Sequence, residues 1–285
     1  MVAPVRFPAT SSAVGSSSIA HDGHKIIYHD THGLLWLLHS RRESELERSP
    51  VFLAENGWAG GDATVVLTEQ ETVNRFGARV VGQKYPPFDG ALDVVVRGMG
   101  KPLSTVWRQW RRGWSHSNPG VLQVISPEGE MFSTSVALRG FSDVTSDVSM
   151  ESLVEERVEW RSLDGAWRGQ VKEFTGDAEV PSDGDLPPLV KVRWDSASTS
   201  SMTLPDGRTV QLPSHPNGGV MTVNLDRGLM GHVTDSDGQT VSELWSQLRG
   251  TVFGVEIEPN SVTRWKVGPG ATLEVSSRYT SPWRW

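Results

Sequence analysis

Short stretches of β-branched and aliphatic residues, each ended by glycine, proline, aspartate or asparagine, recur from Val51 to the end of the chain. Stretches of this length are typical of strands joined by tight turns. The clearest examples cover residues 63–68, 91–97, 121–125 and 131–141. Pro127 and Gly129 favour a turn between the last two, which predicts a hairpin. The sequence therefore predicts a mainly β protein, built as a sandwich or barrel.

One segment has helical rather than strand periodicity. Pro102 suits a first helical turn, and residues 103–114 follow it. The apolar positions share one helical face and are Leu103, Trp107, Trp110 and Trp114. The basic positions fall on the other face and are Arg108, Arg111 and Arg112. Tryptophan interleaved with arginine could stack on bases or sugars, but three tryptophans at helical spacing favour an apolar face packed on a sheet, with the arginines in solvent.

The chain divides most clearly at residues 177–188, which are rich in Gly, Pro, Asp and Ser and poor in apolar residues. This composition is typical of a linker. We therefore expect an arm and first strands over residues 1–50, a β domain with the helix over 51–176, and a β-sandwich over 189–285. A long alternating strand is expected at 152–161 in the first domain. The expected strands of the sandwich are 189–194, 209–212, 219–225, 251–257, 262–267 and 271–279.

The charge balance excludes some functions. The chain has 27 lysine and arginine residues and 34 aspartate and glutamate residues, so its net charge is −7. It therefore has no excess of basic side chains to bind nucleic-acid phosphates. Cysteine is absent, which excludes disulfides, thiolate metal sites and a cysteine nucleophile. The longest apolar run, residues 34–38, is far shorter than a membrane-spanning helix. The first eighteen residues lack the apolar core of a signal peptide and are interpreted as a flexible or docking arm.

The histidines gather near the start of the chain, at positions 21, 24, 29, 32 and 39. Imidazoles near carboxylates can bind zinc, but none of these spacings matches a helical metal motif. The residues between His24 and His29 read as a strand that places these two on opposite faces. We therefore expect polar loop or subunit-contact residues, and neither a metal nor another cofactor.

No catalytic motif is present: the sequence has no phosphate-binding glycine loop, nucleophile elbow or metalloprotease helix. Several of the twelve tryptophans fall after residue 189, so a sugar-stacking platform is an alternative to their burial in a sandwich. The chain ends in Trp283 and Trp285, which could anchor it on a neighbouring chain. The sequence thus predicts no catalytic residues.

The order of these parts resembles the distal tail proteins of long-tailed, non-contractile phages. The resemblance rests on a helix after residues 97–102, the hairpin 121–139, a Glu-Arg-Val-Glu-Trp strand at 156–160 followed by Leu-Asp-Gly-Ala-Trp, the linker, and a final segment with Pro269-Gly270. It covers most of residues 50–285. The histidine-rich start and the aromatic end are not explained by it.

The resemblance implies a tail-tube-like first domain and a galectin-like or carbohydrate-module-like second one. It also implies a hexameric ring in the virion tail that joins the tail tube to the tip or baseplate hub proteins and lets DNA pass without specific binding. Host-surface carbohydrate is a further implied partner, and synthesis would take place in the host cytoplasm. A tail tube protein with an added outer domain and a carbohydrate-binding protein are the alternatives.

Overall fold

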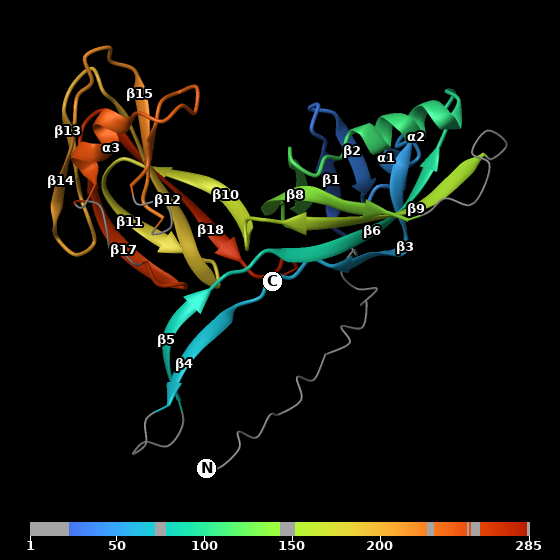
Figure 1. Cartoon of the computed structure of the whole chain (residues 1–285), viewed down its shortest axis with the longest axis horizontal. Helices are drawn as coiled ribbons and strands as arrows, with labels where there is room; N and C mark the ends of the chain where they lie inside the picture. The colour runs from blue at the N-terminus through green and yellow to red at the C-terminus, as the bar shows by residue number, and fades with distance from the viewer. Residues whose placement is uncertain are drawn as a thin grey trace. The chain divides into compact units, whose positions relative to one another are not determined.

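The computed structural model describes residues 23–71, 78–142, 152–226, 231–249, 251 and 257–283. The chain forms two compact units, each assembled from several segments (Figure 1). Residues 1–62, 89–120 and 136–161 belong to the first unit, and residues 63–88, 121–135 and 162–285 to the second. Both are mainly β, as the sequence predicts.

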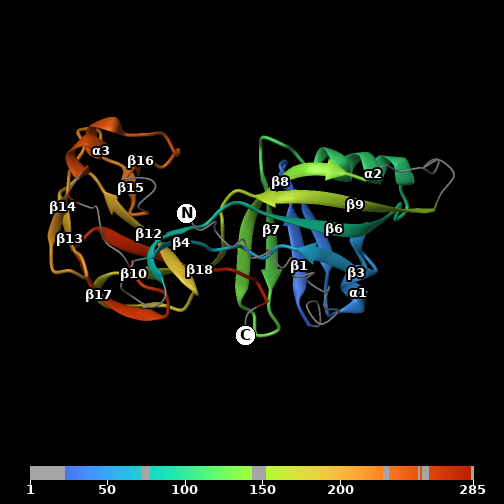
Figure 2. The same cartoon turned by 60° about the horizontal axis from the view of Figure 1, so that its bottom comes forward.

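The first unit is an antiparallel sheet with a helix packed against it. Its elements are β1 (Lys25–His29), β2 (Leu35–His39), α1 (Glu43–Leu46), β3 (Val51–Gly60), β6 (Phe88–Arg97), α2 (Leu103–Arg112), β9 (Leu153–Ser162) and the second half of β8 (Met131–Phe141). Strand β6 pairs with β3 and β9, and β9 also pairs with β8. Figure 2 shows β9 running between β6 and β8.

Aromatic side chains hold α2 in place. The ring of Tyr28 stacks on Trp114 at a centroid distance of 4.0 Å, and its hydroxyl donates to the carbonyl of Gly113. Trp110 is fully buried and meets the edges of Tyr28 and Trp36. The packed-face interpretation of the tryptophans is therefore confirmed for Trp110 and Trp114, while Trp107 is only half-buried.

Two details of the expected helix are wrong. The helix ends at Arg112, and Gly113 forms its C-cap, so Trp114 packs from the following turn. Arg111 does not lie in solvent with its two basic neighbours. Its Nε donates to Oε1 of the fully buried Glu156 at 2.6 Å, because alternation along β9 points that carboxylate inward. The expected strand over 152–161 is confirmed in β9.

The second unit contains a sandwich of two antiparallel sheets. Apart from a hairpin over residues 66–84 and the first half of β8, its strands are β7 (Gly120–Ile125), β10 (Trp167–Phe174), β11 (Gly176–Ser182), β12 (Leu186–Asp195), β13 (Ser200–Thr203), β14 (Thr209–Leu212), β15 (Val220–Asn224), β16 (Val233–Thr234), β17 (Ser261–Val267) and β18 (Ala271–Tyr279). One sheet includes the strands β16-β15-β12-β18-β10 in this order, and the other runs β11-β17-β13-β14. Their shared core is mostly aliphatic, with Trp194 and Trp265 among its buried members.

The expectations for this unit are largely met. Strands β12, β14, β15, β17 and β18 match five of the expected segments, while most of the sixth, at 251–257, lies outside the described residues. The sequence interpretation missed the helix α3 (Ser242–Leu248), which buries Leu244 and Leu248.

The expectation of an irregular linker at residues 177–188 is wrong, because the segment forms β11 and the beginning of β12. Proline is tolerated here for two different reasons. Pro181 lies on β11, the edge strand of its sheet, and edge strands tolerate proline. Pro187 and Pro188 lie where the register between β12 and β18 shifts. A separately folding module over residues 189–285 stays a prediction.

Candidate assembly surface

Strands β4 (Val66–Glu71) and β5 (Ala78–Lys84) form a ribbon of two strands that pair only with each other among the described strands (Figure 1). Pairing runs from Val66 opposite Lys84 to Glu71 opposite Ala78, with a bulge at Val81. We call this hairpin the ribbon. Its large aliphatic side chains are exposed by about half: Val66 by 47%, Leu67 by 46%, Val80 by 45% and Val81 by 52%.

The physical properties of such a hairpin favour association with other strands. An isolated two-stranded hairpin is marginally stable in water, and both of its edges offer unpaired backbone groups. The two strands have thirteen residues, and four of them are exposed aliphatics that a partner would remove from water. The ribbon is thus a candidate surface for a partner.

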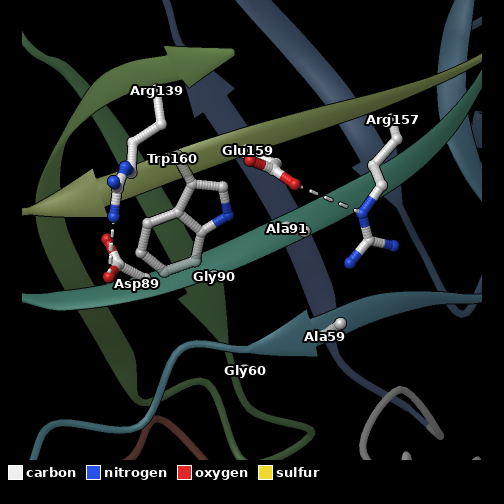
Figure 3. Close-up of a pocket in the computed structure, with 9 residues that line it drawn as sticks. All are labelled: Ala59, Gly60, Asp89, Gly90, Ala91, Arg139, Arg157, Glu159 and Trp160. Atoms are coloured by element: carbon white, nitrogen blue, oxygen red, sulfur yellow. Dashed lines mark hydrogen bonds and ion pairs between the residues drawn. The ribbon is translucent and has the colours of Figure 1, made fainter. Parts of the chain in front are cut away.

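A second feature lies on the sheet of the first unit. A groove of about 330 Å³ crosses β3, β6 and β9 (Figure 3). We call it the Trp160 groove. It is lined by Ala59, Gly60, Asp89, Gly90, Ala91, Arg139, Arg157, Glu159 and Trp160. The groove exists because four of its lining residues are glycine or alanine, and the indole of Trp160 lies directly against Gly90, where a Cβ would come within 2.3 Å of the ring.

Charged side chains at the Trp160 groove neutralise one another. Asp89 accepts hydrogen bonds from Arg161 at 2.8 Å and from Arg139 at 3.0 Å. Arg157 reaches Asp93 at 2.9 Å and lies 4.0 Å from Glu159. The hydrogen bond from Arg161, with that from Arg139, lowers the pKa of Asp89 despite some desolvation. A carboxyl held ionised in this way is poorly suited to donate a proton near neutral pH.

The residues singled out by sequence are not gathered at one site. His24 is buried and His29 half-buried, on opposite faces of β1 as expected, and both belong to the first unit. Trp283 is half-buried in the second unit, and Trp285 lies outside the described residues. Within the described ranges, no group of three histidine, aspartate or glutamate side chains could hold a metal ion.

The sequence interpretation missed the ribbon. It placed a strand at 63–68, which begins three residues before β4 and overlaps it, and it identified no strand that pairs with it. The available signal was Arg79-Val80-Val81, a β-branched pair followed by Gly82 and, after Tyr85, two prolines that end the segment. No described helix has the length and apolar character needed to cross a bilayer.

Comparison with known proteins gives a result only at the level of structure. No family model matches the chain, and no curated protein sequence does. The crystal structure of the SPP1 Dit protein, described as a paradigm of the hub adsorption apparatus in phages infecting Gram-positive bacteria, matches with a TM-score of 0.57 at 12% identity. This match covers 90% of this chain and 98% of that one.

Two structures of the phage P2 baseplate in its activated conformation, with calcium and with strontium, match with TM-scores of 0.50 at 6% identity. They cover 89% of this chain, and 98% and 97% of theirs. The chain therefore has the fold of a phage distal tail hub protein, as the sequence resemblance predicts.

Proposed function

We propose that this chain is a structural protein of a phage tail, which assembles into a closed, hexameric ring between the tail tube and the tip or baseplate proteins and lets the genome pass. The observation that carries the proposal is the fold match to SPP1 Dit over nearly the full length of both chains. A partial match would support only a shared domain, whereas this one includes both compact units of the chain.

The physical properties of the chain support a ring without a cofactor. A ring needs a heterologous interface, in which one surface of each copy binds a different surface of the next. The ribbon offers exposed aliphatics and open strand edges for such a contact. An obligate interface buries about 2,000 Å² or more, so other surfaces contribute too. We propose Trp283 and Trp285 as further anchors at the end of the chain. We also propose His24 and His29 as contacts near its start.

The net charge of −7 suits a channel through which DNA slides, because an acidic wall repels phosphates instead of binding them. The paired charges at the Trp160 groove leave no arginine there free for a phosphate: Arg139 and Arg161 both bind Asp89, and Arg157 binds Asp93. The sandwich of the second unit would then face partners outside the ring, host carbohydrate among them.

Native mass spectrometry of the purified chain tests the ring directly. We expect a species of six times the 31.3 kDa chain mass, seen as rings by negative-stain electron microscopy. A chain that stays monomeric at high concentration and is absent from virions contradicts the proposal. Rings that stack into long tubes would favour the tail tube alternative, and retention on a polysaccharide column by a monomer would favour the carbohydrate-binding alternative.

A further inference from the structure

The two faces of the ribbon carry opposite charge. Residues directly opposite each other in an antiparallel pair point to the same side, and successive residues point to opposite sides. The observed register therefore places Val66, Lys84 and Arg79 on one face, with Gln70 opposite Arg79. We call this the basic face of the ribbon.

The other face combines apolar and acidic side chains. Leu67 lies opposite Gln83, and Glu69 lies opposite Val80, so all four share this side of the ribbon. We call it the acidic face. Glu69, Arg79 and Lys84 are all exposed, and none of the three forms an ion pair with another described residue. Each face thus has aliphatic surface and at least one charge with no counter-charge among the described residues.

We infer that the ribbon packs on the ribbon of a second copy of this chain, with the acidic face of one copy on the basic face of the next. This inference rests on the proposed ring and names the surface that closes it. Aliphatic side chains on both faces mean that covering one side alone leaves the other exposed. Stacking of ribbons covers both, because every copy has a neighbour on each side.

Charge selects this arrangement over a two-fold one. A symmetric pair of acidic faces would bring two Glu69 carboxylates together, and a symmetric pair of basic faces would bring together four cations. Packing of the acidic face on the basic face places Glu69 near Arg79 and Lys84 of the neighbouring copy. Such a contact is heterologous, and its repetition with rotation generates a ring. A second copy is favoured over DNA as the occupant, since two cations on one face release few counterions.

Reversing the charge of one face at a time tests the inference. Glu69→Lys replaces the Glu69 carboxylate on the acidic face by a cation, and Arg79→Glu with Lys84→Glu replaces the two cations on the basic face by carboxylates. Each variant alone should assemble at least about tenfold more weakly than the natural chain, because attraction between faces becomes repulsion. An equimolar mixture of the two should assemble again, since every contact in an alternating ring of the two variants joins unlike charges.

Two matched controls separate this effect from a change in net charge. Glu128→Lys changes the charge as Glu69→Lys does, in an exposed turn of another hairpin. Arg264→Glu with Lys266→Glu makes the same change in net charge as the double variant, on exposed positions of β17 whose ion pairs with Glu179 and Asp177 it also removes. Both controls should assemble like the natural chain. Mass photometry over a range of concentrations measures assembly, and far-ultraviolet circular dichroism checks that every variant is folded.

The outcomes separate this inference from the proposed function. A natural chain that does not assemble overturns the ring and, with it, the stacking of ribbons. A natural chain that forms rings while the ribbon variants form them equally well overturns only the stacking. Variants that lose assembly but are not rescued by mixing also overturn it, since the ribbon would then bind some other surface. Loss on reversal with rescue on mixing supports it.

Discussion

Apolar side chains are buried in the α2-covered sheet of the first unit and exposed in the ribbon of the second. Trp110 has no exposed surface, while Leu67 is 46% exposed although it lies in a regular strand. Burial of a large aromatic side chain contributes roughly 2–3 kcal/mol to folding, and half-exposed aliphatics contribute much less. Stability is therefore concentrated in the sheet, whereas the ribbon is available for binding. Substitutions in the two regions should separate these roles.

The largest expected effect is at the ion pair beneath α2. Arg111 lies between the rings of Trp107 and Phe141 and neutralises Glu156, which is 3% exposed. Arg111→Leu leaves a buried carboxylate without its counter-charge, so we expect a loss of about 3–5 kcal/mol in the free energy of unfolding. Urea denaturation measures it. Arg108→Leu, on the exposed side of the same helix, should change stability by less than about 0.5 kcal/mol.

The pH dependence of that variant provides a second readout. Burial raises the pKa of Glu156, and Arg111 offsets this in the natural chain. A folded-state pKa above the unfolded one means that the folded state holds the proton more tightly, so stability rises as pH falls through that pKa. The loss caused by Arg111→Leu should accordingly shrink between pH 7 and pH 5. A loss independent of pH would contradict burial of the charge as its cause.

The next largest effect on stability is expected from a glycine in the sheet, compared with a glycine in the ribbon. A Cβ at Gly90 would meet the Trp160 ring at 2.3 Å, whereas a Cβ at Gly82 in the ribbon would meet only Thr68, at 3.7 Å. Gly90→Ala should cost about 1–3 kcal/mol through overpacking. Gly82→Ala should be neutral or slightly stabilising, because it removes backbone freedom from the unfolded chain without a clash. Thermal unfolding of the two variants compares the regions directly, and equal losses would contradict the comparison.

A smaller effect is expected at Asp89, on the rim of the Trp160 groove. Its pKa is lowered by Arg161 and Arg139, so its contribution to stability is present above the unfolded pKa near 4 and is lost as pH falls through the folded one. Because the partners are exposed, Asp89→Asn should cost about 1 kcal/mol or less at pH 7. The difference should vanish near pH 2 in thermal melts. Asp62→Asn, which removes a carboxyl at another exposed position, serves as the control.

The sequence predicts the elements that alternate and misses those that do not. Strand β9 and helix α2 each bury one face, so their apolar residues recur with the period of the structure. Strand β5 buries neither face, and its Val80-Val81 pair breaks the alternation at a bulge, so periodicity had nothing to detect. The error at 177–188 has a similar origin, because proline on an edge strand has the composition of a linker.

The Trp160 groove could not be found from sequence for a different reason. It depends on the pairing of Gly60 with Gly90, thirty positions apart along the chain, and on Trp160 lying beneath them. The register after the irregularity between Leu53 and Trp58 decides which small residues meet. Long-range register of this kind is set by packing of the whole sheet, which a single sequence does not display.

The smallest effect on stability is expected in the ribbon itself, at Leu67. Leu67→Thr keeps strand propensity, because threonine is β-branched, and removes only apolar surface that is half-exposed already. The free energy of unfolding should therefore change by less than about 0.5 kcal/mol. Assembly should weaken nonetheless, because the acidic face loses one of its two aliphatic contacts with the neighbouring copy. Urea denaturation and mass photometry on the same sample make both measurements. A marked loss of stability with assembly unchanged would show that Leu67 packs within its own chain, and would remove the contrast between the ribbon and the sheet.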